Sequence, residues 1–281
     1  IIGASDIPHV VLGAWVAKRL GVPFAADLYD NFEGFGQARI PGFVPALRRA
    51  VRSADLVTTT SQPLADYVRD TYRARGEIIA MPSTVDKTVF HPRDKLACRR
   101  ALGLPEDARL IGTAGGLSRD KGIVALYDAW NQLKDDRTDV HLVLAGPHQA
   151  EFPPPSGERV HYLGALPHGR IAELFNALDV GIISVLDTPF GRYCFPQKAY
   201  EMLACGLPVA AADIGAMSHL FAGIPQSLFS AADARSLADC VRAQLAYPAR
   251  PDMRIDDWQA LISKLEPELL RLIRGRAPAS T

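Results

Sequence analysis

Two short stretches place charged side chains where a strand is expected to give way to a helix. The first, "GTAGGLSRDKG", carries the glycines Gly115 and Gly116 and the cations Arg119 and Lys121. Glycine lets the backbone approach a ligand closely, and the unpaired N–H groups at a helix N-terminus favour an anion. The pattern indicates a pyrophosphate cradle; a Gly-rich turn with solvated charges is the alternative. It is not a Walker loop, because Lys121 is followed by Gly122 rather than by Ser or Thr.

The second stretch, "FPQKAYE", holds Lys198 and Glu201 three residues apart, so both lie on one face of the expected helix. A carboxylate in the first turn can accept two hydroxyls at once, as a ribose diol requires, and Lys198 would face phosphate. The alternative is a local surface pair of these two residues, worth at most about 0.5 kcal/mol. The residues that follow, "MLACGLPVAAAD", need only a core role, with Gly206 ending the helix.

A third polar stretch, "DLYDNFEGFG", follows an expected strand in the first half of the chain. It carries Asp27, Asp30 and Glu33, which could bind sugar hydroxyls or act as a base, or could form a solvated loop. Downstream, the segment "ALRRAVRSA" predicts a helix with a basic face formed by Arg48, Arg49 and Arg52. Such a face can contact an anionic membrane, although a solvated face is the favoured interpretation.

Composition and charge exclude several classes of protein. The 281 residues suggest about two domains, and 48% hydrophobic with 22% charged residues is ordinary for a globular chain. The net charge of zero argues against a nucleic-acid binder. The four scattered Cys and seven His show no metal-ligand spacing, so no metal site is predicted, and His161 and His168 are assigned structural roles. The scattered cysteines also fit a reducing, cytoplasmic location. No apolar run reaches the about 18 residues that cross a bilayer.

Short apolar runs alternate with amphipathic segments, which predicts parallel sheets covered by helices. In the first half, strands are expected over 23–29, 54–61 and 77–83, and helices over 8–20, 42–53 and 63–73. The stretch 84–108, rich in Pro and charge, breaks this rhythm and is interpreted as a linker. A second strand–helix series follows from residue 109, and a long helix is expected over 255–273 before the disordered-looking tail "GRAPAST".

The predicted fold class is therefore α/β, with two Rossmann-like doubly wound parallel-sheet domains. Residues 1–91 are expected to form the remainder of the first domain, 92–250 the second domain, and 251–281 a C-terminal helix and tail packing back toward the first. The chain lacks an initiator Met and opens on what reads as the end of a strand, so a fragment with an upstream start is expected. Ligands of such sheets bind outside the carboxyl ends of the strands.

Taken in order, these segments resemble the glycosyltransferase family 4 type of nucleotide-sugar-dependent glycosyltransferases, which have the two-Rossmann GT-B architecture. "PSTVDKTVFHP" is similar to the family's linker, "GGLSRDKG" to its phosphate loop, and "FPQKAYEMLACGLPVAAAD" to its most diagnostic stretch. The resemblance covers the chain from Pro23 to its end. Each motif is moderately specific, whereas the ordered set is strongly so.

The resemblance implies a role for each matching residue. Lys121, together with Arg119, would bind the donor diphosphate and stabilise charge on the leaving group, and Glu201 would hold the ribose hydroxyls. The implied donor-binding residues are Gly115, Gly116, Leu166, Pro167, Phe195, Pro196, Lys198 and Glu201, and the implied catalytic residues are Lys121, Arg119 and Glu201. Leu166 and Pro167 would line the base. Tyr29 and Asp30 would lie on the acceptor side.

The sequence departs from the family's pattern at three positions. Tyr193 stands where the first glutamate of a conserved pair is expected, which puts one donor-sugar contact in doubt. Gly116 stands in place of an arginine, for which Arg119 can substitute. Tyr29 stands where many relatives have histidine, and a tyrosine is a poor base near neutral pH.

The implied function is transfer of a sugar from a UDP- or GDP-sugar to an acceptor hydroxyl of a glycan, lipid or small molecule. The family retains the anomeric configuration and needs no obligatory metal or other cofactor. The basic helix with Arg48, Arg49 and Arg52 also leaves open a peripheral contact with the inner face of a membrane. The alternatives are a nucleotide-sugar epimerase of the same architecture, which turns over without an acceptor, and a non-catalytic nucleotide-sugar-binding homologue.

Overall fold

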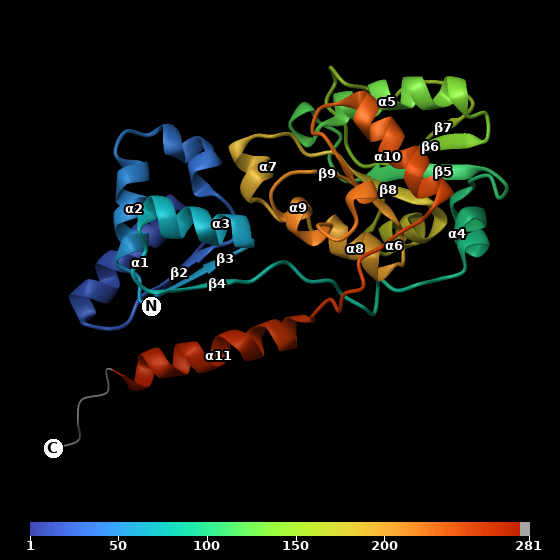
Figure 1. The fold of residues 1–281 in the computed structure, drawn as a ribbon. Coiled ribbons are helices and arrows are strands. Elements are labelled where there is room, and N and C mark those ends of the chain that lie inside the picture. Colours follow the sequence, from blue (N-terminus) through green and yellow to red (C-terminus); the bar gives the residue numbers. More distant parts are fainter. Residues whose placement is uncertain (276–281) are drawn as a thin grey trace. The chain divides into compact units, whose positions relative to one another are not determined.

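The computed structural model describes residues 1–275, so most of the predicted disordered tail lies outside the described residues. The chain folds into two compact units (Figure 1). Unit 1 comprises Ile1–Ser83, Thr188–Phe195 and the chain from Asp256, and unit 2 comprises Thr84–Asp187 and Pro196–Ile255. The domain boundaries predicted from the sequence, at residues 91 and 250, stay predictions.

Unit 1 is built on a four-stranded parallel sheet with the order β1-β2-β3-β4 within its described residues. The strands are β1 (Ile2–Gly3), β2 (Ala25–Leu28), β3 (Leu56–Thr59) and β4 (Glu77–Ala80). The helices are α1 (Ile7–Leu20), α2 (Phe43–Arg52) and α3 (Gln62–Tyr67), which continues into a π-helical turn, Val68–Tyr72. The strands and helices predicted for this half are confirmed. Helix α1 packs on α2 over a core that includes Val10, Leu47 and Val57.

Unit 2 holds a six-stranded parallel sheet in its described residues, with the order β10-β9-β8-β5-β6-β7. The strands are β5 (Arg109–Ala114), β6 (Val140–Ala145), β7 (Val160–Tyr162), β8 (Val180–Ile183), β9 (Val209–Ala212) and β10 (Leu228–Phe229). Helices α5 (Ile123–Asp136) and α10 (Ala234–Ala246) cover one face, and α6 (His168–Ala177) and α8 (Lys198–Ala204) cover the other (Figure 1). Strands β8 and β9 are buried throughout, as expected of a parallel sheet with both faces covered.

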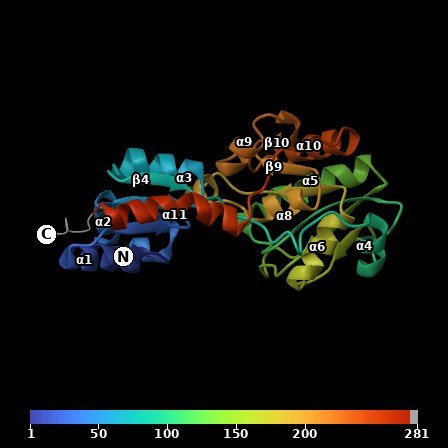
Figure 2. The same cartoon turned by 90° about the horizontal axis from the view of Figure 1, so that it is seen from below.

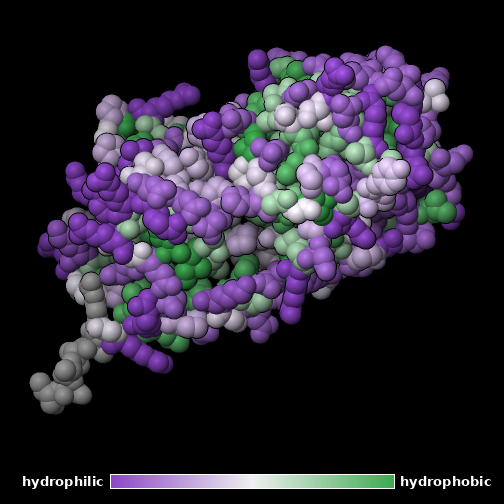
Figure 3. Space-filling model, in the orientation of Figure 1, coloured by the Kyte–Doolittle hydropathy of each residue, from purple (hydrophilic) through white to green (hydrophobic). Residues whose placement is uncertain are grey.

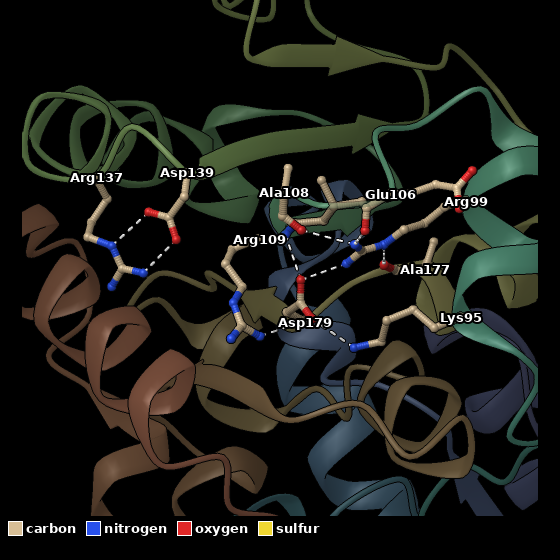
Figure 4. Close-up of polar contacts among 10 residues, drawn as sticks. Lys95, Arg99, Glu106, Ala108, Arg109, Arg137, Asp139, Ala177 and Asp179 are labelled. Atoms are coloured by element: carbon tan, nitrogen blue, oxygen red, sulfur yellow. Dashed lines mark hydrogen bonds and ion pairs between the residues drawn. The ribbon is translucent and has the colours of Figure 1, made fainter.

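The linker predicted over 84–108 is wrong for part of its length, because it contains helix α4 (Lys95–Leu102). Asp94 caps this helix by accepting the backbone N–H of Ala97. Arg99 of this helix is only 3% exposed. Its guanidinium donates to the Asp179 carboxylate at 2.7 Å and to the Ala177 carbonyl at 2.9 Å (Figure 4). A buried ion pair thus fixes α4 beside the sheet.

Two short helices lie in segments for which no helix was predicted, α7 (Pro189–Tyr193) and α9 (Ala216–Leu220). Helix α7 lies inside a stretch expected to be loop; Thr188 caps it by accepting the N–H of Gly191 at 3.2 Å.

The long C-terminal helix predicted over 255–273 is confirmed as α11 (Trp258–Arg274), with Pro267 inside it. Helix α11 belongs to unit 1, and Figure 2 shows it in front of other elements of that unit. Arg271 donates to the Glu77 carboxylate of β4 at 2.7 Å. On the face shown in Figure 3 the surface is mostly hydrophilic, with separate apolar patches. Within residues 1–275, none of the helices combines the length and the hydropathy that crossing a bilayer requires.

Candidate functional site

The turn after β5 is held in place by the turn after β6. Gly115 has a φ of 113°, and a Cβ added to Gly146 would lie 2.0 Å from the Gly115 carbonyl oxygen. The two backbones can therefore approach only because residue 146 is glycine. Further along, the N–H of Leu117 donates to the Pro147 carbonyl at 2.8 Å. Gly115 and Gly116 themselves are exposed, so their backbone is accessible to a ligand.

Lys121 ends a 3-10 turn, Arg119–Lys121, and its backbone is anchored to the end of β8. The Ser184 hydroxyl donates to the Lys121 carbonyl at 3.0 Å. Gly122, which follows with a φ of 72°, has room for no Cβ, because that atom would lie 2.0 Å from the Ser184 carbonyl oxygen. The side chains of Arg119 and Lys121 are exposed. Two exposed cations thus lie on a backbone fixed at the carboxyl edge of the sheet.

Lys198 brings the "FPQKAYE" stretch to the same edge. Its ammonium donates to the Thr113 hydroxyl at 3.1 Å and to the Ala114 carbonyl at 3.2 Å, at the last two residues of β5. The next residue of the chain is Gly115. The structure therefore brings together the two stretches that the sequence singled out, although they lie more than eighty residues apart.

Glu201 lies one turn further along α8, and its side chain is only 12% exposed. The Gln197 amide donates to Glu201 Oε1 at 3.3 Å, and His168 Nε2 lies 3.8 Å from the same oxygen. Burial raises the pKa of Glu201, and the nearby charges of His168 and Lys198 offset part of that rise. The carboxyl group is thus shielded and positioned, which a surface Lys–Glu pair would not require.

Leu166 and Pro167 lie in the turn between β7 and α6. The N–H of Gly146 donates to the Gly164 carbonyl at 2.7 Å, which ties this turn to the one after β6. Leu166 is half-buried, and the exposed Pro167 precedes the first residue of α6, His168. Sequence reasoning assigned His168 a structural role, whereas the structure places it beside Glu201. The sequence held one signal for this placement, because His168 directly follows the turn expected to line the base.

The acceptor-side residues belong to unit 1. Tyr29 and Asp30 follow the carboxyl end of β2. Tyr29 is half exposed, with its ring edge-on to that of Phe32 at 5.2 Å, and the Asp30 carboxylate accepts the N–H of Asn31 at 2.7 Å. Phe195, expected on the donor side, is the last residue of the 188–195 segment of unit 1 and is half-buried.

A polar network in unit 1 corrects two interpretations of the sequence. Arg48 donates to both oxygens of Glu33, at 2.7 and 2.9 Å, and the Tyr67 hydroxyl donates to Glu33 at 3.0 Å. Burial alone would raise the pKa of Glu33, but hydrogen bonds from Arg48, Tyr72 and Tyr67 lower it. Glu33 is therefore neither a solvated loop residue nor an unpaired sugar ligand. The charge of Arg48 is likewise paired with Glu33 and does not add to the basic face. Membrane contact through the rest of that face stays a prediction.

Tyr193 takes part in the packing of unit 1. Its ring stacks on that of Tyr67, with centroids 4.6 Å apart at 29°, and its carbonyl accepts the Ser61 hydroxyl at 2.7 Å. The position where the family pattern places a carboxylate therefore holds an aromatic anchor. Within the described chain, no group of three or more His, Cys, Asp and Glu side chains is arranged to hold a metal ion.

Comparison with known proteins gives a consistent result. Residues 108–246 match the family model described as glycosyl transferases group 1. The D-inositol 3-phosphate glycosyltransferase of Stackebrandtia nassauensis is 30% identical over 230 residues, which are 75% of this chain and 49% of that protein. The chain thus spans about half the length of this relative.

Two solved structures resemble the fold. Sucrose-phosphate synthase from Thermosynechococcus elongatus has a TM-score of 0.73 at 22% identity, covering 94% of this chain and 72% of the other. HepE of Anabaena, solved in complex with UDP, has a TM-score of 0.73 at 20% identity, covering 94% and 77%. At these identities the likeness concerns the fold, and the predicted two-sheet GT-B architecture is confirmed.

Proposed function

We propose that the protein transfers a sugar from a nucleotide-sugar donor to an acceptor hydroxyl, because residues 108–246 match the family model of the group 1 glycosyltransferases. One observation carries the proposal beyond the family match. Lys198 reaches the last residues of β5 beside the exposed Gly115 and Gly116, and the shielded Glu201 lies one turn away on the same helix. Phosphate-binding and diol-binding groups are thus available at one edge of one sheet.

In this proposal the donor diphosphate lies over the turn after β5. The exposed backbone of Gly115 and Gly116 approaches it, and Lys198 exchanges its bond to the Ala114 carbonyl for a phosphate oxygen. Arg119 and Lys121 supply positive charge where the leaving diphosphate develops negative charge, which is the electrostatic stabilisation that dominates such reactions. Their backbone anchoring supports this role, because preorganised charges cost little reorganisation during the reaction.

Glu201 accepts the two ribose hydroxyls in the proposed complex. Its burial and the bond from Gln197 support this assignment, because a carboxylate that is held and shielded binds a diol without losing side-chain freedom. The remaining donor contacts are assigned by the family resemblance to Leu166 and Pro167 at the base, and to Phe195 and Pro196 near the phosphates.

We assign the acceptor to the side of Tyr29 and Asp30, in a first domain extending to residue 91. Residues 92–250 form the donor domain in this proposal, and 251–281 a C-terminal helix and tail that packs back toward the first domain. The acceptor is a glycan, lipid or small molecule. Transfer proceeds with retention at the anomeric carbon and without an obligatory metal, as the resemblance implies. A cytoplasmic location is proposed on the same basis.

A donor screen tests the function. Titration with UDP and GDP should show binding of one or both, and incubation with several nucleotide sugars should show slow hydrolysis of the preferred donor. Absence of binding by any nucleoside diphosphate or nucleotide sugar would refute the proposal. NMR of the product anomer tests retention, and activity in excess EDTA tests metal independence.

Tyr193 gives the non-catalytic alternative a specific basis, because a donor-sugar carboxylate is replaced there by an anchored ring. Binding of the donor with neither hydrolysis nor transfer would favour that alternative. Turnover of a nucleotide sugar to its epimer without an acceptor would instead favour an epimerase.

A further inference from the structure

We propose that His168 is a positioning residue of the donor site, whose imidazolium keeps the Glu201 carboxylate ionised and oriented toward the ribose hydroxyls. His168 Nε2 lies 3.8 Å from Glu201 Oε1, close enough for an ion pair when the imidazole is protonated. The inference rests on the proposed function, since it concerns the residue assigned to the ribose. It adds a histidine that neither the family resemblance nor the motifs select.

The histidine is held in place by its surroundings. It is the first residue of α6, so its backbone direction is set by the helix that begins there. Its ring packs edge-on against Phe90 with centroids 4.9 Å apart, and Phe90 is buried. The outer part of the imidazole stays in solvent, since 62% of the side chain is exposed. The imidazole is thus held in place by its contacts and accessible to solvent.

The charges around the pair decide its behaviour. Two carboxylates interact with His168, those of Glu201 and Asp86. On the side of Glu201, Lys198 supplies a second positive charge from the same helix. The thiol of Cys205, whose pKa burial raises to about 12, stays neutral. His168 and Lys198 therefore supply the positive charges that act on Glu201.

The protonation of Glu201 decides what it can bind. An ionised carboxylate accepts hydrogen bonds at both oxygens, whereas a protonated one must place its own O–H and accepts fewer. Burial raises the pKa of Glu201 above its ordinary value, and the positive charge on His168 lowers it. Affinity that depends on the ribose hydroxyls is therefore present above this pKa and lost as the pH falls through it. Removing the charge at position 168 raises the pKa of Glu201 and moves the loss to higher pH.

The experiment compares two ligands across pH. Whichever of UDP and GDP binds is titrated calorimetrically beside its 2′,3′-dideoxy analogue, which has the same phosphates but lacks the diol. The ratio of the two dissociation constants isolates the hydroxyl contribution from the titration of the phosphates. It is measured for the unchanged protein and for His168→Lys, His168→Gln and His168→Glu, with His219→Gln, an exposed histidine of α9, as the matched control.

The ratio of the two dissociation constants should change with pH around a midpoint. The pH of this midpoint should rise as residue 168 is changed in the order Lys, His, Gln, Glu. Each step should be about 0.2–0.7 pH unit, because water screens a pair whose histidine is largely exposed. His219→Gln should leave the midpoint unchanged. Binding of the dideoxy analogue by each variant shows that its site is folded.

The outcomes separate the two proposals. Binding of both ligands with midpoints that do not follow the charge at residue 168 overturns the role of His168 and leaves the proposed function intact. Binding of neither ligand by the unchanged protein overturns both.

Discussion

Removing Asp179 should destabilise unit 2 far more than removing an exposed carboxylate with the same kind of partner. Asp179 precedes β8 and accepts three hydrogen bonds (Figure 4). Arg99 donates at 2.7 Å, Lys95 at 2.8 Å and the N–H of Leu110 at 2.8 Å. The substitution Asp179→Ala therefore leaves the buried guanidinium of Arg99 without its counter-charge.

The expected cost follows from this environment. Breaking a buried ion pair by removing one partner costs about 3–5 kcal/mol, because a charge is left uncompensated away from water. Arg99 keeps its hydrogen bonds to the carbonyls of Ala177, Glu106 and Ala108, which lie at 2.6–3.0 Å. These carbonyls continue to stabilise the guanidinium, so we expect the lower end of the range, about 3 kcal/mol.

Urea unfolding followed by tryptophan fluorescence measures this cost. Trp130 belongs to unit 2 and is 2% exposed, whereas Trp15 and Trp258 belong to unit 1 and are each 59% exposed. Transfer of Trp130 into water should dominate the signal. The matched control is Asp139→Ala, which removes a two-bond pair with Arg137, at 2.8 and 2.9 Å, between partly exposed side chains (Figure 4). That change should cost at most about 1 kcal/mol.

Two results would refute this reasoning. One is an equal loss of unfolding free energy for Asp179→Ala and Asp139→Ala. The other is a failure of Arg99→Met, added to Asp179→Ala, to recover part of the stability, because the double change removes the uncompensated charge.

Further substitutions test the donor site and its scaffold. Lys121→Ala should lower the kcat of sugar transfer about 10²–10³-fold, since it removes preorganised charge, and an unchanged kcat contradicts that role. Glu201→Gln should weaken nucleoside diphosphate binding at least about tenfold, since a hydrogen bond to a charged group contributes about 1.5–3 kcal/mol, and calorimetry measures the loss. Gly122→Ala should lower the urea midpoint of unit 2, because the new Cβ would lie 2.0 Å from the Ser184 carbonyl oxygen. The Cys205 thiol, whose pKa burial raises to about 12, should resist iodoacetamide at mildly alkaline pH until the protein unfolds; rapid labelling of the folded protein contradicts this.

Matched controls exist in the same unit. Lys134→Ala changes a half-buried side chain and Glu158→Gln an exposed one, both away from the proposed donor site, and both should leave transfer and binding unchanged. Gly169→Ala adds a methyl group with no atom within 4 Å of it, and should not lower the midpoint. Equal midpoints for Gly122→Ala and Gly169→Ala would show that the close approach to Ser184 tolerates a side chain.

The sequence was sufficient to predict those elements and site residues whose signal lies in neighbouring residues. Alternating apolar runs gave the strands, and glycine, lysine and glutamate at set spacings marked the two stretches that meet at the end of β5. The helix α4 was missed because Arg99 reads as a solvated charge until Asp179, eighty residues later, is placed beside it. No composition rule reports such a pairing.

The contact of His168 with Glu201 was not predicted from the sequence, for the same reason. The contact joins α6 to α8, so only the position of His168 beside the expected base-lining turn hinted at it in the sequence. Arg48 and Glu33 show the converse, since each looked solvated alone and they satisfy each other in the folded unit. Tertiary partners, rather than propensities, decide which charged residues remain available for chemistry.

The chain passes between the units after Ser83, Asp187, Phe195 and Ile255, so neither unit is one continuous segment. A gene fragment that ends at residue 83 would lack α7, and with it the ring that stacks on Tyr67 and the carbonyl that accepts the Ser61 hydroxyl. Recombination between homologues meets the same constraint. A chimaera that exchanges the first 83 residues must also exchange residues 188–195, or Tyr67 and Ser61 will face a foreign surface.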